Sequence, residues 1–177
     1  MKGIVNSLLI VKHPFDWDGR RNGKGFIQFT ERDYQLMEAM GISIYSLHAP
    51  MDKNRNDSVV STAYAFAKII KMKVLEEFAS LEDNPDLLLG LIGKVPEGKI
   101  DAFVKRLNST LNYRVKVTKR DDKIGTVAVV TGGGFVPEII RAAKERGVTT
   151  YITGVITPNS SEYSKNNYAN TLSEINK

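Results

Sequence analysis

The chain has 177 residues, of which 42% are hydrophobic and 25% charged, and it contains no cysteine. These values are typical of a globular protein with one domain or two small lobes, and they exclude disulfides, cysteine metal sites and thiol catalysis. The net charge of +5 is dispersed among acidic residues, so nucleic acid is not an expected partner. No apolar run approaches the roughly 18 residues of a membrane span, and no signal peptide is recognisable, so we expect a cytoplasmic protein without a membrane partner.

The first predicted elements are a strand, a helix and a second strand. Two short apolar runs, residues 8–11 and 42–47, favour strands. Thr30 is expected to begin the helix between them, with Asp33 completing a variant of the capping box, and Gly41 is expected to end it. Two strands joined in this way should run parallel as neighbours, so that their carboxyl ends share one edge of the sheet.

A second helix is predicted over residues 57–71, where apolar side chains recur at helical spacing. The polar stretch 80–86 contains an Asn-Pro pair and is the best candidate for a lobe boundary. We therefore predict a first α/β lobe over residues 1–83 and a second over residues 84–177.

In the second lobe the sequence pattern predicts further alternating strands and helices. Its expected elements are a strand at 87–92, a helix at 96–111, a strand with one exposed face at 114–119, a buried strand at 127–130, a helix at 137–146, a strand at 148–152 and a helix at 167–175. The whole pattern predicts an α/β fold of two lobes, with mainly parallel or mixed sheets flanked by helices.

The only two histidines of the chain each follow a predicted strand. His13 comes after the first apolar run and His48 after the second, with Asp52 four residues further on. Ligands of open α/β sheets bind at the carboxyl ends of strands, and imidazole and carboxylate groups suit zinc, iron or manganese. A metal site is one interpretation of these residues. The other is that each histidine is a hydrogen-bonding loop residue.

A glycine-rich loop, residues 132–134, follows the buried strand 127–130 and precedes a helix. Backbone amides in such a loop can hold a phosphate or another anion. The loop lacks the Lys-Ser/Thr ending of a Walker A motif and the complete dinucleotide fingerprint. The alternative interpretation is a tight turn that packs the helix against its strand.

Four segments, LLIVKHPFDW, YSLHAPMD, VAVVTGGGF and YITGVITP, follow one another in the chain. In this order they resemble the Nif-three-like family, whose members are often labelled type 2 homologues of GTP cyclohydrolase I. The resemblance extends over about residues 7–161. It implies α/β lobes, a dinuclear metal centre, and assembly of identical subunits into a hexameric ring.

The resemblance also assigns roles to individual residues. The family's double histidine falls on Lys12 and His13, so that lysine replaces the first metal ligand. The histidine and aspartate of the next motif fall on His48 and Asp52, of which the aspartate is a ligand. The implied metal ligands are therefore His13 and Asp52, and His48 is the expected catalytic proton carrier or substrate contact.

The chain departs from the family at both ends, since it lacks the family's amino-terminal strand and the terminal segment whose histidine and glutamate complete the metal centre. We therefore expect a shortened member that binds zinc, iron or manganese weakly, or only one ion, because no bridging carboxylate remains. The expected function is metal-dependent hydrolysis of a nucleotide or similar small molecule. The alternative is a non-catalytic assembly or regulatory protein that retains the scaffold.

Overall fold

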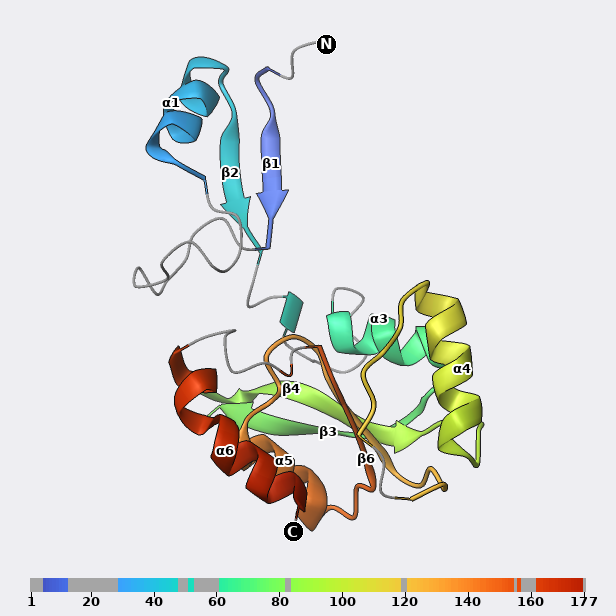
Figure 1. The fold of residues 1–177 in the computed structure, drawn as a ribbon. Coiled ribbons are helices and arrows are strands. Elements are labelled where there is room, and N and C mark those ends of the chain that lie inside the picture. Colours follow the sequence, from blue (N-terminus) through green and yellow to red (C-terminus); the bar gives the residue numbers. More distant parts are fainter. Residues whose placement is uncertain are drawn as a thin grey trace. The chain divides into compact units, whose positions relative to one another are not determined.

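The computed structural model describes residues 5–12, 29–47, 51–52, 61–81, 84–118, 121–154, 156 and 162–176. The chain divides into two compact units, residues 1–51 and 52–177. The first contains β1 (Leu8–Val11), α1 (Glu31–Ala39) and β2 (Ser43–Ser46) (Figure 1). The second contains α3 (Thr62–Ile69), β3 (Lys73–Leu81), β4 (Asn84–Lys94), α4 (Ile100–Leu111), β5 (Val127–Val130), α5 (Pro137–Glu145), β6 (Thr150–Thr153) and α6 (Glu162–Asn176).

The first unit confirms the predicted strand–helix–strand arrangement. β1 and β2 pair in parallel, and their register runs from Leu8 opposite Ser43 to Val11 opposite Ser46. The capping box is present at the start of α1, because the Thr30 side chain accepts a hydrogen bond from the Asp33 N–H and the Asp33 carboxylate accepts one from the Thr30 N–H. These two bonds satisfy backbone donors that the helix itself leaves without an acceptor.

The second unit is built on a four-stranded sheet in the order β3-β4-β5-β6. β3 and β5 are antiparallel to β4, whereas β5 and β6 are parallel to each other and are connected through α5. This confirms the βαβ unit that the sequence predicts around the glycine-rich loop. All four residues of β5 are buried, as expected for a central strand covered on both faces.

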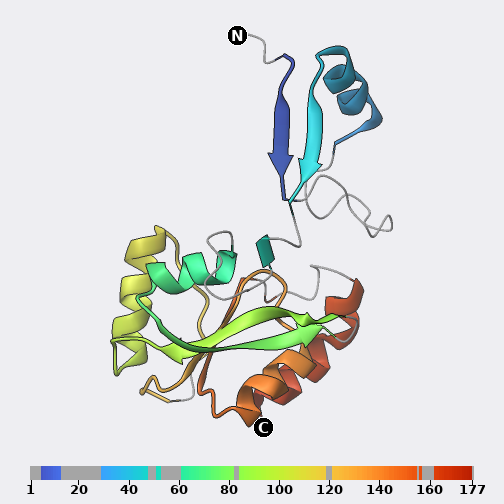
Figure 2. The same ribbon diagram turned by 180° about the vertical axis from the view of Figure 1, so that it is seen from behind.

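Two hydrophobic clusters cover opposite faces of this sheet. Successive β5 side chains point to opposite faces, so Val127 and Val129 join one cluster while Ala128 and Val130 join the other. Helices α3 and α4 supply the first cluster, and α5 supplies the second, as Figure 1 and the reverse view in Figure 2 show. α6 packs on α5, where the Lys144 ammonium donates a 2.7 Å hydrogen bond to the Glu174 carbonyl.

Three features differ from the sequence prediction. The division between units falls after Met51, whereas the boundary expected at 83/84 lies within the connection of two paired strands, β3 and β4. β3 itself was not predicted. Residues 114–118, expected to form a strand, adopt no regular structure, because the Val115 N–H donates a 2.8 Å hydrogen bond to the Asn108 side chain and none of the described strands pairs with this segment.

None of the described helices combines the length and the apolar character needed to cross a lipid bilayer.

Candidate metal centre

The parallel pairing of β1 and β2 aligns the two chain segments that carry the histidines. The Leu47 N–H donates a 2.8 Å hydrogen bond to the Val11 carbonyl, which continues the ladder one position beyond the strands. The Ser46 hydroxyl lies 3.5 Å from the Lys12 carbonyl, at the limit of a hydrogen bond. Lys12 and Leu47, the residues directly before the two histidines, therefore follow neighbouring strand ends.

The sequence separation of the histidines matches this register. Leu8 and Ser43, which pair directly, are 35 positions apart, and so are His13 and His48. The two histidines therefore follow the ends of β1 and β2 at equal distances along the sequence. Ligands of α/β proteins bind at this edge, where parallel strands end.

The structure tests the predicted site residues only in part. His13 and His48 lie outside the described residues. Asp52 is described and is half-buried in a short helical turn with Met51. Within the described part of the chain, no three acidic, histidine or cysteine residues are grouped so that they could hold a metal ion. The assignment of His13 and Asp52 as ligands and of His48 as a catalytic residue stays a prediction.

Lys12, which stands where the resemblance implies a histidine, is half-buried at the end of β1. A protonated amine cannot coordinate a metal, and its charge opposes the approach of a cation. Lys12 therefore cannot supply the metal ligand that the resemblance implies at this position.

The glycine-rich loop is held by its own neighbours. The Tyr151 hydroxyl donates a 2.6 Å hydrogen bond to the Gly134 carbonyl, and burial raises the pKa of this phenol. Gly132 has a φ of +77°, and a Cβ atom at Gly134 would lie 2.6 Å from the Val130 side chain. Gly132 therefore requires glycine because of its backbone conformation, and Gly134 because Val130 leaves no room for a side chain, which favours the tight-turn interpretation of the loop.

A contact that the sequence analysis did not identify joins this loop to α3. The Thr62 and Thr131 hydroxyl oxygens lie 2.7 Å apart although the two residues are 69 positions apart. Thr62 is the first residue of α3, and Thr131 follows β5 directly. Hydroxyl groups therefore line the carboxyl end of β5, where the sequence carries no histidine or acidic residue.

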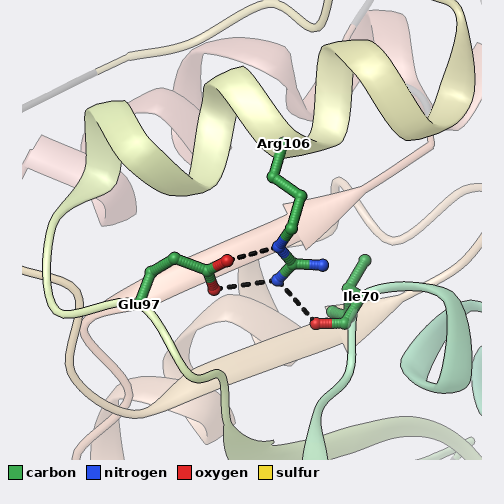
Figure 3. A network of polar contacts seen from close by, with 3 residues as sticks. All are labelled: Ile70, Glu97 and Arg106. Carbon is green, nitrogen blue, oxygen red and sulfur yellow. Dashed lines mark hydrogen bonds and ion pairs between the residues drawn. The ribbon is translucent and has the colours of Figure 1, made fainter.

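Charged groups also meet on the α4 side of the second unit, where their role is structural. The Arg106 guanidinium donates hydrogen bonds to both carboxylate oxygens of Glu97 and, at 2.7 Å, to the Ile70 carbonyl at the end of α3 (Figure 3). These hydrogen bonds lower the pKa of Glu97. Arg106 thus ties α4 both to the loop that precedes it and to α3.

The fold and these contacts can be compared with known proteins. The family model of Duf34/NIF3, NGG1p interacting factor 3, matches residues 4–171. The chain belongs to the DUF34/NIF3 family. The resemblance to Nif-three-like proteins that its four sequence segments indicate is thus confirmed. Curated protein sequences provide no significant match.

Solved structures share the α/β fold of this DUF34/NIF3 chain. Protein ybgI, described as of unknown function, superposes with a TM-score of 0.63 at 20% identity, covering 93% of this chain. Reduced HcgD from Methanocaldococcus jannaschii gives 0.56 at 18% identity over 93% of this chain, and Staphylococcus aureus protein SA1388 gives 0.52 at 16% identity over 78%. The chain spans 60% of the length of ybgI and of HcgD and 56% of SA1388.

Proposed function

We propose that this DUF34/NIF3 chain binds one divalent transition-metal ion through His13 and Asp52, which follow β1 and β2 in the sequence. The observation that supports the proposal is the parallel register of the two strands, which the separation of His13 and His48 matches. Imidazole and carboxylate donors suit zinc, iron and manganese. We propose one ion because Lys12 stands where the resemblance implies a further histidine ligand.

The proposed reaction is hydrolysis of a nucleotide or a similar small molecule. A bound divalent ion polarises a phosphoryl or carbonyl oxygen and lowers the pKa of a water molecule. His48 is the proposed proton carrier, because a histidine side chain exchanges protons near neutral pH. Asp52 and His13 supply ligand atoms and have no separate role in proton transfer.

The activity is tested by following the hydrolysis of a panel of nucleoside mono-, di- and triphosphates with zinc, iron(II) or manganese(II). The proposal predicts turnover that depends on the metal and falls at least about 100-fold in His48→Ala, since proton transfer contributes on that order. His48→Ala should retain the metal of the unchanged chain. Turnover equal in His48→Ala and the unchanged chain would disprove the role of His48.

Lys12 favours a second candidate function, a non-catalytic assembly or regulatory protein on the same scaffold. Its half-buried position at the end of β1 places a cationic residue next in sequence to the proposed ligand His13. The variant Lys12→His separates the two candidates. If the chain is a non-catalytic scaffold, the unchanged protein binds no metal and only Lys12→His gains it. If our first proposal holds, both proteins bind metal and the variant binds it more tightly.

A further inference from the structure

Residues 114–118 follow α4 and belong to none of the described strands (Figure 1). The start of this segment is fixed to the helix, because the Tyr113 N–H donates a 3.2 Å hydrogen bond to the Asn108 carbonyl and the Val115 N–H donates one of 2.8 Å to the Asn108 side chain. No backbone hydrogen bond joins residues 116–118 to another described residue. Backbone N–H and C=O groups in this state can pair with an added strand.

A groove of about 570 Å³ lies between this segment and α4. Its apolar surface consists of valine side chains. Val115 packs against the hydrophobic cluster beneath α3 and α4, whereas Val117 has 44% of its surface exposed although it is apolar. The groove can therefore accept an apolar side chain from a partner. The lining residues are Val104, Asn108, Arg114, Val115, Lys116 and Val117.

Both charged side chains in the groove lining are cations. Arg114 and Lys116 are exposed and stand on either side of Val115 in the sequence. Neither cation forms an ion pair with another described residue, and none of the described acidic residues lines the groove. The alternation of cationic and apolar side chains is typical of a strand with one charged and one apolar face. A partner with the opposite charge and the same alternation would complement it.

We propose that an extended acidic segment of another protein pairs as a strand with residues 114–118. Acidic side chains of this segment lie opposite Arg114 and Lys116, and the apolar side chains between them enter the groove and contact Val104 and Val117. In strand addition the main-chain hydrogen bonds supply affinity, and alternate side chains supply specificity. Opposite-charge pairs and apolar pairs across two strands are both favourable, so each face of the segment gains a partner.

Other occupants complement this surface less well. A second copy of the segment would place its own cations opposite cations or valines, so neither Arg114 nor Lys116 would gain an anion. A nucleic acid would supply anionic phosphates but would leave the exposed Val117 without an apolar partner. An acidic segment with alternating apolar residues satisfies both requirements. This surface does not depend on the proposed metal site.

A synthetic peptide in which glutamate and valine alternate is the probe for this surface. Its control has the same composition, with the glutamates grouped at one end. In NMR titrations of the isotopically labelled full chain, the alternating peptide should bind about tenfold or more tightly than the grouped one. It should also slow hydrogen exchange of at least one amide proton of residues 116–118. Equal affinities for the two peptides, or unchanged exchange at these amides, would overturn the proposed strand pairing.

Charge reversal tests the role of the two cations. Arg114→Glu/Lys116→Glu should weaken binding of the glutamate–valine peptide about tenfold or more and should bind a lysine–valine peptide instead. Arg146→Glu/Lys165→Glu changes the net charge equally at exposed positions of other helices and should bind as the unchanged chain does.

Two further outcomes would overturn the proposal in favour of another occupant. The first is tighter binding of a single-stranded oligonucleotide than of the glutamate–valine peptide, which would indicate nucleic acid. The second is a smaller mass of Arg114→Glu/Lys116→Glu than of the unchanged chain by light scattering, which would indicate that a second copy occupies the groove.

Discussion

The Leu47 N–H donates a 2.8 Å hydrogen bond to the Val11 carbonyl, and this bond joins the two extended segments that lead to His48 and His13. It extends a parallel ladder that otherwise ends at Val11 and Ser46. The two motifs, far apart in sequence, thereby follow the same edge of one sheet. The proposed metal centre depends on this relationship more than on any other in the fold.

Arg106 is predicted to stabilise the second unit. Arg106→Ala removes hydrogen bonds to Glu97 and to the Ile70 carbonyl, in a region where the arginine and glutamate side chains are only 22% and 15% exposed. Because Glu97 then loses its cationic partner, we expect the free energy of unfolding to fall by about 2 kcal/mol. Urea denaturation measures the change. Lys105→Ala, on an exposed position of the same helix, should have little effect.

Glu97 makes the stabilisation that it forms with Arg106 dependent on pH. Its pKa is lowered in the folded state, so its stabilising effect is present above the ordinary glutamate pKa and is lost as the pH falls through the lowered value. Urea midpoints measured from pH 7 down to pH 3 should therefore fall more steeply for the unchanged chain than for Glu97→Gln. Parallel curves for the two proteins would contradict this prediction.

Tyr151 is predicted to hold the glycine-rich loop against β6. Tyr151→Phe removes the donor to the Gly134 carbonyl and should lower the free energy of unfolding by about 1 kcal/mol at pH 7. The folded-state pKa of Tyr151 is raised by burial, so its contribution persists below the ordinary tyrosine pKa and declines as the pH rises above it. The difference in the free energy of unfolding between the unchanged chain and Tyr151→Phe should therefore become smaller above about pH 10. Tyr113→Phe, 71% exposed, is the control.

Gly93 is predicted to be essential for the β3–β4 pair. A Cβ atom there would overlap the Lys73 carbonyl oxygen, a backbone atom that cannot rotate away. Gly93→Ala should therefore cost about 2 kcal/mol or more, which thermal denaturation can detect. Gly98→Ala is a matched control, since no atom lies within 4 Å of an added Cβ at that position. Equal melting temperatures for the two variants would contradict the prediction.

The elements with strong local signals could be predicted from the sequence. α1 has its capping box, and the β5–α5–β6 unit combines a buried apolar run with Pro137 and Gly147 at the ends of its helix. β3 lacked such a signal, because the extra residue near Leu75 interrupts the two-residue alternation that identifies a strand.

The sequence also led to a prediction that the structure does not support. Residues 114–118 alternate as a strand does, but alternation does not supply a partner strand, and the Asn108 side chain binds the Val115 N–H instead. At the candidate site, the two apolar runs predicted that β1 and β2 are parallel neighbours and end at the same edge of their sheet. The contact between Thr62 and Thr131 could not be predicted, since it depends on tertiary packing across 69 positions.

The most direct test of the proposed metal centre is elemental analysis of the full chain purified without chelator. We predict up to one equivalent of zinc, iron or manganese per chain, and a loss of most of it in His13→Ala and in Asp52→Ala. Asp101→Ala, which removes an exposed carboxylate on α4, should leave the metal content unchanged. Less than a tenth of an equivalent in the unchanged chain, or equal metal content in Asp52→Ala and Asp101→Ala, would contradict the account.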